Sequence, residues 1–344
     1  MEQGGVETVV CDLNRVLVKA GCRNVVLSRG GRLVGRIELD GGRHVALDLK
    51  SKNPLTYFSR AWRLRRILRA EKPDLVCVHS RVPAWLFVWA NRGLGFRWIS
   101  YAHGANSVSR YSEVMTKGDL VVTPSQFLAD YLKANYGTSE SKIRVIPNAV
   151  DTARFDPDNL DLAFVVEKRR EWGIREGDHV AMAIGRITPV KGLEGLIRNF
   201  ARSVAEGRDT TACSRKLVIV GGADKHHQKY LESLKVLSSS LIPDPSSLIF
   251  AGPQEKIPEC ISIADEVVSA NTTKPESFGL SIVEAYAMNK PVRVARRFGG
   301  AAEVMAAVEK SGKPTLREAV LDLYGFDRWT ARTLAVYREA ANMV

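Results

Sequence analysis

The chain lacks any run of apolar residues long enough to cross a lipid bilayer. A membrane-spanning helix needs about 18 such residues, and the longest candidate, residues 82–90, is far shorter. The N-terminus has none of the features of a secretory signal peptide. These absences predict a soluble protein of the cytoplasm.

Cysteine is scarce, and its spacing argues against two kinds of structural site. The 344 residues include five cysteines, an odd number, and no two of them form a C-x-x-C pair. A disulfide framework or a structural zinc site is therefore not indicated, and we expect free thiols. With 45% hydrophobic and 26% charged residues, the chain is neither disordered nor collagen-like, and its length predicts two domains.

Common cofactor and metal motifs are also missing. The sequence has no P-loop pattern, and Gly93 and Gly95 lack the third glycine of a dinucleotide fingerprint because Trp98 stands in its place. Asp156 and Asp158 form a D-x-D pattern, but it lies in a proline-containing turn, and we interpret it as a turn. We therefore predict neither a bound metal nor a cofactor.

Positive charge is concentrated in the first half of the chain. The net charge is +12, of which residues 1–150 carry +11 and residues 151–344 only +1. A basic surface confined to one half predicts an anionic partner there. Nucleic acid, an anionic membrane surface and a phosphorylated substrate all remain open on charge alone.

Short hydrophobic segments alternate with stretches of helical length, which is typical of parallel sheets with crossover helices. Strands are predicted at residues 23–28, 44–47, 75–79, 97–102, 120–123 and 142–146, and then at 180–184, 216–220, 248–251, 266–269 and 291–295. The fold class is therefore α/β, with two doubly wound Rossmann-like domains. We place the domains at residues 1–148 and 149–325, and expect a C-terminal helix at 326–344 that packs back across the join.

A helix predicted at residues 56–70 is strongly basic as well as amphipathic. Its apolar residues, Phe58 and Trp62 among them, lie near one face, and arginines occupy the remainder. Such a helix can pack on a sheet with a solvated outer face, or it can lie on a membrane surface. The sequence leaves both readings open.

The clearest motif for chemistry is GRITPVKG, residues 185–192. It follows a buried strand and opens a helix, which places Gly185, Arg186 and Lys191 at the carboxyl end of a strand. Open α/β sheets bind their ligands at such ends. Because arginine and lysine together can hold both phosphates of a diphosphate, this turn predicts a phosphate-binding site.

A second motif, PESFGLSIVE, brings two glutamates to the start of another helix. Glu276 lies in the loop, and Glu284 follows eight positions later, about two turns plus 80° around the helix, so the two carboxylates need not share surroundings. The loop amides that precede and open the helix form a ready anion site; they belong to Ser277, Phe278, Gly279 and Leu280. Polyhydroxyl ligands such as ribose and hexose are natural partners for the two carboxylates.

These motifs resemble those of the family 4 retaining glycosyltransferases, which have the two-domain GT-B fold. The resemblance rests on GRITPVKG, LVIVGG (217–222), PESFGLSIVEAYAMNKPV (275–292) and FGGAAE (298–303). It extends to EQGGVE (2–7), HGANSVSRY (103–111) and IPNAVDTARFDP (146–157). Bacterial members that build the lipopolysaccharide core of the cell envelope are the most similar.

The resemblance implies a role for individual residues of the second domain. Arg186 and Lys191 would bind the diphosphate of the donor, Glu276 would face the donor sugar, and Glu284 would bind the nucleotide ribose. Gly221 would allow close approach near the nucleotide, although a simple tight turn explains it equally well.

In the first domain the resemblance assigns Gly4 and Gly5 to a loop that approaches phosphate and acceptor. It assigns His103 a contact with the donor sugar across the cleft between the domains. A histidine at a strand end that is satisfied by backbone groups is the alternative for His103.

The sequence departs from the family at two places. No strand precedes the Gly4–Gly5 loop, so we expect an incomplete N-terminal domain in which neighbouring strand edges are unpaired or forced together, from a start placed too late or from a truncated protein. After Glu303 the chain continues in a helical pattern where the family has a glycine-rich turn and a short strand. Neither departure touches the donor motifs.

The resemblance and the motifs together predict a metal-independent, retaining transfer of a sugar from a nucleotide diphosphate sugar to a glycan or lipid-linked acceptor, in lipopolysaccharide or envelope synthesis. Alternatives are a nucleotide-sugar epimerase or phosphorylase on the same fold and a catalytically impaired, nucleotide-sugar-binding protein. A nucleic-acid partner has only the basic charge in its favour, and we predict none. A peripheral contact with the anionic cytoplasmic face of the inner membrane is a further expectation.

Overall fold

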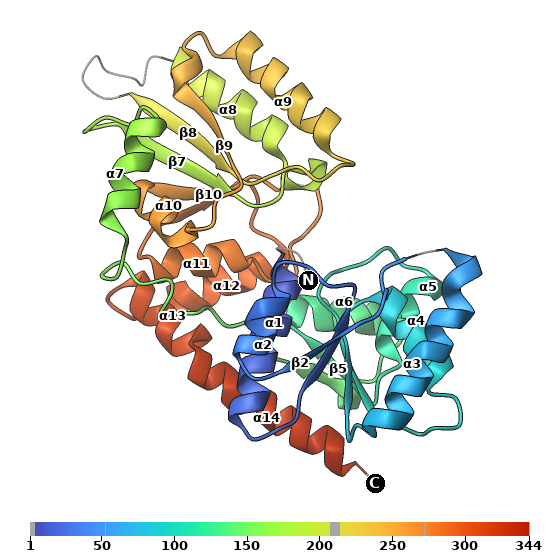
Figure 1. Cartoon of the computed structure of the whole chain (residues 1–344). Helices are drawn as coiled ribbons and strands as arrows, with labels where there is room; N and C mark the ends of the chain where they lie inside the picture. Colours follow the sequence, from blue (N-terminus) through green and yellow to red (C-terminus); the bar gives the residue numbers. More distant parts are fainter. Residues whose placement is uncertain (1–3, 52, 207–213, 272, 344) are drawn as a thin grey trace. The chain divides into compact units, whose positions relative to one another are not determined.

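The computed structural model describes residues 4–51, 53–206, 214–271 and 273–343 (Figure 1). The chain divides into two compact units. Unit 1 consists of the residues up to Asn148 together with those from Asp327 onward, and unit 2 consists of Ala149–Phe326. Each unit is an α/β structure with parallel strands, as the sequence predicts.

The strands of unit 1 form two separate parallel sheets rather than one. A two-stranded sheet has the order β1-β2, and a four-stranded sheet has the order β3-β4-β5-β6. The strands are β1 (Val25–Ser28), β2 (Arg43–Ala46), β3 (Val76–Val78), β4 (Trp98–Tyr101), β5 (Leu120–Thr123) and β6 (Ile143–Val145).

All six strands lie where the hydrophobic pattern predicts them, and the unit has the parallel α/β architecture that the sequence predicts. In the described part of the chain, β1 pairs only with β2, and β3 pairs only with β4. Among the described residues, the edges of β1 and β3 are therefore not paired with each other.

Helices cover the strands of unit 1 with apolar side chains. Apolar side chains of α3 and α4 pack with those of β3 and β4 in one core. Helix α6 packs on β5 through Leu128 and Leu132. Ser125 caps the start of α6 by accepting a hydrogen bond from the Leu128 amide, and Gly137 ends it in a left-handed conformation. The helices are α1 (Gly5–Lys19), α2 (Val34–Leu39), α3 (Tyr57–Glu71), α4 (Arg81–Ala90), α5 (Arg110–Glu113), α6 (Gln126–Tyr136) and α14 (Phe326–Asn342), with 3₁₀ turns η1 (Pro54–Thr56), η2 (Val114–Thr116) and η3 (Glu140–Lys142).

The C-terminal helix α14 completes unit 1. Its Tyr337 hydroxyl accepts a hydrogen bond from the Cys77 thiol at 3.0 Å and lies 3.4 Å from the Tyr101 hydroxyl. Glu339 forms an ion pair with Arg144. The last helix of the chain thus packs against residues that precede it by about two hundred positions.

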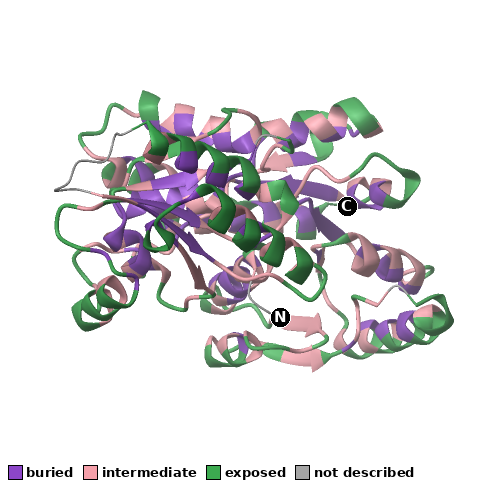
Figure 2. Ribbon diagram, turned by 90° about the horizontal axis from the view of Figure 1, so that it is seen from above, coloured by how far each residue is buried: buried purple, intermediate pink, exposed green. Residues whose placement is uncertain are grey.

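Unit 2 contains a five-stranded parallel sheet of order β11-β10-β7-β8-β9. Alternate residues of β7 enter different cores: Ala181 and Ala183 pack with α8, whereas Val180 and Met182 pack with α10. Both faces of the sheet are therefore covered (Figure 2). The strands are β7 (His179–Ile184), β8 (Arg215–Val220), β9 (Leu248–Gly252), β10 (Glu266–Ser269) and β11 (Val292–Val294).

Amphipathic spacing explains why the helices of unit 2 form where they do. In α8, Leu193, Leu196, Ile197 and Phe200 recur at helical spacing, and all four are buried. Burying a side chain of this size stabilises the fold by about 1.5–3 kcal/mol. The helices are α7 (Leu162–Glu171), α8 (Leu193–Ala205), α9 (Gln228–Leu241), α10 (Ile257–Ile263), α11 (Leu280–Ala287), α12 (Gly299–Lys310) and α13 (Leu316–Tyr324), with 3₁₀ turns η4 (Pro189–Lys191) and η5 (Pro245–Ser247).

The segment after β11 is helical, as predicted. Residues 299–310 form α12, a left-handed Gly312 follows, and α13 comes next. The described residues after β11 include no further strand, so β11 is an edge of the sheet. Within the described residues, no helix combines the length and apolar character needed to span a membrane.

The contacts of Tyr337 generate a prediction about the stability of unit 1. Replacing it with Phe leaves the half-buried Cys77 thiol and the hydroxyl of the buried Tyr101 without their partner, which should lower the free energy of unfolding by about 1–3 kcal/mol. Chemical denaturation measures this difference. Tyr136→Phe is the matched control, because its hydroxyl makes only a 3.4 Å contact near the surface; equal effects of the two substitutions would contradict the prediction.

Candidate functional site

The carboxyl ends of β7, β8 and β9 approach one another closely at two glycines. The Gly185 amide donates to Val220 O at 3.0 Å, and the Gly221 amide donates to Gly252 O at 2.9 Å. A Cβ atom at Gly221 would lie 1.8 Å from Gly185 O, and the backbone there has a φ of +146°. Only glycine fits this position, so close packing of the strand ends, not merely a tight turn, explains Gly221.

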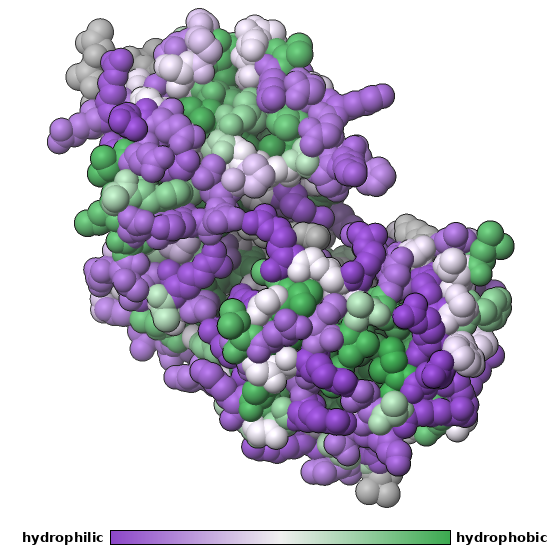
Figure 3. Space-filling view, in the orientation of Figure 1, coloured by the Kyte–Doolittle hydropathy of each residue, from purple (hydrophilic) through white to green (hydrophobic). Residues whose placement is uncertain are grey.

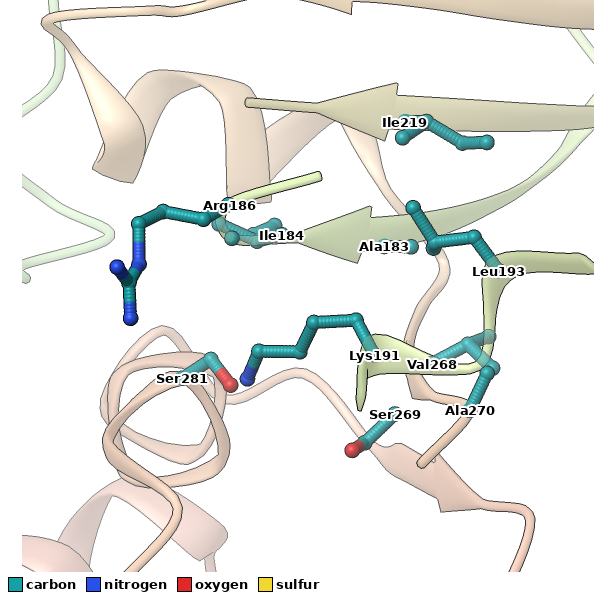
Figure 4. A pocket seen from close by; sticks show the side chains of 11 residues that line it. Ala183, Ile184, Arg186, Lys191, Leu193, Ile219, Val268, Ser269, Ala270 and Ser281 are labelled. Atoms are coloured by element: carbon teal, nitrogen blue, oxygen red, sulfur yellow. The ribbon is translucent and has the colours of Figure 1, made fainter. Parts of the chain in front are cut away.

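The GRITPVKG segment leaves β7 at Gly185 and passes through η4 before α8 begins. Its last residue, Gly192, has a left-handed backbone with a φ of +67°, and a Cβ there would lie 2.2 Å from Ala270 O. The turn is therefore pressed against the chain that follows β10. This contact directs the Lys191 side chain toward α11, whose Ser281 faces it in Figure 4.

Lys191 and Glu276, 85 positions apart in the sequence, form an ion pair. The glutamate side chain is largely shielded from solvent. The two motifs that the sequence singled out separately thus meet in one place.

Asn271 shapes the loop that carries Glu276. Its side-chain amide donates to Lys274 O, and its side-chain oxygen accepts from the amides of Thr273 and Lys274 at 3.3 and 3.2 Å. This side chain is buried directly after β10. Sequence reasoning missed it, although a polar residue just past a hydrophobic strand is the signal that would have found it.

The start of α12 holds the same loop from the other side. The Gly300 amide donates to Glu276 O at 2.8 Å. A Cβ at Gly300 would lie 2.1 Å from Ser277 O, and one at Gly299 would lie 2.6 Å from Pro275 Cβ. The two glycines of the FGG segment therefore allow α12 to touch the Glu276 loop directly.

A pocket lies between the β7 turn and α11, within unit 2 (Figure 4). Arg186 and Lys191 both line it, and no described acidic side chain pairs with Arg186, which is exposed. The other lining residues are Ala183, Ile184, Gly185, Leu193, Ile219, Val268, Ser269, Ala270 and Ser281. Two cations at the edge of a small pocket make a site suited to an anion.

The residues predicted as loop amides open α11, but they do not all face the pocket. Gly279 has a φ of +94° and precedes the first residue of the helix, Leu280. The Phe278 ring is buried and meets the Tyr324 ring edge-on at 5.6 Å. Its side chain therefore belongs to the core, and only its backbone is left for a ligand; Ser277 is half-buried beside it.

Glu284 lies on the same helix in surroundings distinct from those of Glu276. Burial raises the pKa of its carboxyl to about 7, and the positive charge of Arg154 opposes this effect. A carboxyl in such surroundings gains from hydroxyl groups that donate hydrogen bonds to it. The sequence did not indicate the proximity of Arg154.

In unit 1, His103 follows β4 and His79 follows β3. His79 Nδ1 and His103 Nε2 are 3.0 Å apart, and the two rings stack. Burial lowers the pKa of His103 to about 4 and also holds the pKa of His79 well below its usual range. Both imidazoles are therefore neutral at pH 7, and a second side chain, not only the backbone, contacts His103.

Gly4 and Gly5 begin α1. Gly4 O accepts hydrogen bonds from the Thr8 amide at 3.0 Å and hydroxyl at 3.1 Å. Asp156 accepts from the Asp158 amide at 3.2 Å and pairs with Arg317, as expected for a turn. The described residues contain no cluster of three or more side chains suited to holding a metal ion.

The contact of Gly300 with the Glu276 loop predicts that a single methyl group at this position is destabilising. Gly300→Ala should lower the free energy of unfolding by about 1–3 kcal/mol, because the added Cβ overlaps Ser277 O. Gly195→Ala in α8 is the control, since its Cβ meets nothing within 4 Å and alanine favours a helix by up to about 1 kcal/mol. Thermal denaturation compares them; a stabilising Gly300→Ala would refute this contact.

The raised pKa of Glu284 predicts a pH dependence of stability. The unfolded chain loses this proton near pH 4.5, whereas the folded protein keeps it to about pH 7. Raising the pH through this window therefore favours the unfolded state. Relative to Glu284→Gln, the wild-type protein should lose unfolding free energy between pH 5 and pH 8. Denaturation at both pH values tests this, and a difference between the two proteins that does not change with pH would contradict it.

Sequence comparison assigns both halves of the chain to known families. Residues 3–154 match the family described as Glycosyltransferase Family 4, and residues 165–312 match Glycosyl transferases group 1. A D-inositol 3-phosphate glycosyltransferase of Acidothermus cellulolyticus is 32% identical over 192 residues. That match covers 55% of this chain and 40% of the relative, so it spans well under two thirds of the relative's length.

Solved structures with a similar fold cover the whole chain. A glycosyltransferase from Rickettsia africae superposes with a TM-score of 0.83 at 23% identity, covering 100% of this chain and 98% of that one. HepE of Anabaena, in complex with UDP-glucose, gives 0.79 at 18% identity, covering 98% and 96%. WaaG, involved in lipopolysaccharide biosynthesis, gives 0.66 at 14% identity, covering 99% and 92%.

At these identities the structural likeness shows the fold, and the two family models, neither of which spans half of the chain by itself, show which family each half resembles. Both agree with the resemblance carried by the motifs. The chain is family 4 glycosyltransferase-like, with the two-domain GT-B fold.

Proposed function

We propose that unit 2 binds a nucleotide diphosphate sugar and that the protein transfers this sugar, with retention, to a phosphorylated or lipid-linked acceptor. The observation that carries the proposal is the meeting of Lys191 and Glu276 at a pocket that Arg186 also lines. A diphosphate needs cations, and a sugar needs hydrogen-bond acceptors for its hydroxyls. Both kinds of group lie at this one sheet edge.

Arg186 and Lys191 are proposed to hold the diphosphate. Arg186 offers a planar fork of donors, and Lys191 offers a compact charge on a flexible stem. Two cations beside the leaving group would also stabilise the negative charge that develops on it during transfer. No described acidic side chain neutralises Arg186, so its full charge is available to a ligand.

The ion pair between Lys191 and Glu276 suggests how these two side chains could exchange each other for groups of a bound donor. In the structure each group satisfies the other. A bound donor would supply phosphate oxygens for Lys191 and hydroxyls for Glu276, so that both groups gain a partner as they separate. The ion pair therefore keeps either charge from being left uncompensated.

Glu284 is proposed to bind the ribose hydroxyls. Its carboxyl has a pKa near 7 because it is buried with little compensation. Two adjacent hydroxyls donating to one carboxylate would relieve this cost. HepE, a structural neighbour, was solved with UDP-glucose, which supports a nucleotide sugar as the ligand class.

His103 is proposed to contact the donor sugar as a neutral hydrogen-bonding group. With a pKa of about 4 it is not a cation at pH 7. It therefore suits a hydroxyl rather than a phosphate. The contact with His79 would fix which ring nitrogen carries the proton.

The acceptor is proposed to be anionic. Residues 1–150 carry a net charge of +11, which would attract a phosphorylated polyol, glycan or lipid headgroup. The name of the Acidothermus relative, D-inositol 3-phosphate glycosyltransferase, gives an acceptor of this class for that protein. An acceptor of the bacterial envelope at the cytoplasmic face of the inner membrane fits the same charge.

We call Arg186 and Lys191 the phosphate clamp, and the binding of UDP tests it directly. Arg186→Ala and Lys191→Ala should each weaken the binding of UDP about 10- to 100-fold, because each removes a charged hydrogen bond to phosphate. Arg198→Ala removes an exposed arginine of α8 that does not line the pocket and should leave binding unchanged. Isothermal titration calorimetry measures all four proteins, the wild type included.

Undiminished UDP binding in both variants would overturn the assignment of the clamp. A turnover assay with a panel of nucleotide sugars then separates transfer from binding alone. The anomeric configuration of the product, read by NMR, tests retention. Product formed without any acceptor would indicate an epimerase instead.

A further inference from the structure

A surface of unit 1 that the proposed donor site does not use combines exposed apolar and basic side chains. Leu55 of η1 is 88% exposed, and Phe58 and Trp62 of α3 are 63% and 54% exposed. Phe58 and Trp62 are four residues apart and therefore lie on the same side of α3. Leu55 precedes Phe58 by three residues, in the 3₁₀ turn that leads into the helix. Apolar side chains of this size exposed together mark an interaction surface.

Three arginines continue the same surface along α3. Arg63, Arg66 and Arg69 are all exposed, and the Arg66 guanidinium lies 4.9 Å from the centroid of the Trp62 ring. Residues 49–70 contain no acidic residue. Glu71, which ends the helix, pairs with Arg23 and Arg43 instead. We call Leu55, Phe58, Trp62, Arg63, Arg66 and Arg69 the α3 face.

Packing fixes which side of α3 points outward. Ala61, Leu64 and Leu68 are buried in the core with α4. Two other arginines serve the fold: Arg60 is buried and donates to backbone oxygens, and Arg65 donates to Ala90 O at 2.7 Å. The α3 face is therefore what remains after the internal packing is complete, and Figure 3 shows green apolar side chains at the surface near the start of this helix.

Helix α7 in unit 2 shows that exposed apolar residues alone do not make such a surface. Val166 is 67% exposed there, and Arg170 is exposed. However, Glu167 and Glu171 alternate with its cations, and Lys168 forms an ion pair with Glu171. Helix α7 thus resembles an ordinary solvated helix, whereas the α3 face has charge of one sign.

We propose that the α3 face docks the protein on the surface of an anionic lipid bilayer. Phe58 and Trp62 would enter the headgroup region together with Leu55, while the arginines would contact lipid phosphates. Tryptophan prefers this interface because its side chain combines an apolar ring system with a polar N–H group. This inference rests on the proposed function in one respect: it would bring the enzyme to a lipid-linked acceptor.

Two other occupants fit the α3 face less well. A second copy of the chain related by a twofold axis would place arginines against arginines, since such an interface uses the same patch on both copies. Nucleic acid would use the arginines but would leave Leu55 and Phe58 exposed to water. A bilayer surface satisfies both kinds of side chain.

Vesicle binding by the full chain tests the proposal. The protein should sediment with phosphatidylcholine vesicles that contain roughly one third phosphatidylglycerol and not with phosphatidylcholine alone. Arg63→Ala with Arg66→Ala should weaken this binding about 30-fold, because each cation near an anionic surface contributes a factor of about five. Phe58→Ser with Trp62→Ser should weaken it at least tenfold.

The fluorescence of Trp62 also reports how deeply the α3 face enters the bilayer. Trp62 is the exposed tryptophan among the six, and the others are buried or half-buried. Its fluorescence should shift to the blue on vesicles and be quenched by brominated lipid. Trp62→Phe should keep vesicle binding but lose most of this quenching.

The matched control is Val166→Ser with Arg170→Ala on α7, which removes the same kinds of exposed side chain. It should bind vesicles as the wild type does. All α3 variants should keep wild-type UDP binding, whereas Arg186→Ala should keep vesicle binding, so the two proposals can fail separately.

Three results would overturn the docking of the α3 face on a bilayer. The first is equal vesicle binding by the wild type and both α3 double variants. The second is self-association that the α3 substitutions abolish in a protein that ignores vesicles. The third is tight binding of duplex nucleic acid by the wild type and by Phe58→Ser with Trp62→Ser, without vesicle binding.

Discussion

The ion pair of Lys191 with Glu276 is the contact on which the candidate site depends, because it joins two loops that are far apart in the sequence. A lysine and a carboxylate that lose water as the loops close need each other's charge. The same two groups are complementary to a diphosphate and to sugar hydroxyls. One interaction thus joins the two loops of the site and indicates the chemistry of a ligand that could replace it.

Glycines make this contact geometrically possible. Gly221 lets the ends of β7 and β8 approach, Gly192 lets the lysine-bearing turn press against Ala270, and Gly300 lets α12 hold the glutamate loop. A Cβ atom at any of them would lie about 2 Å from a backbone oxygen. The glycines in these motifs therefore serve close backbone packing, which fixes where the charged side chains can reach.

Sequence patterns predicted the strands well, since short buried segments have a strong hydrophobic signal, and all eleven predicted strands form. The directions in which side chains point were harder to predict from the sequence. Nothing in the sequence shows that Phe278 turns into the core, because this depends on its contact with the distant Tyr324.

We propose that the two units have different tasks: unit 2 would bind the donor at its sheet edge, and the positive charge of unit 1 would attract an anionic acceptor. The central claim is that the Lys191–Glu276 pair opens to receive a nucleotide diphosphate sugar. A crystal structure with UDP-glucose bound tests it most directly. We predict phosphate oxygens within hydrogen-bonding distance of Arg186 and Lys191, with Glu276 released from Lys191 and turned to the sugar. A nucleotide bound elsewhere, or an ion pair still closed beneath it, would contradict the claim.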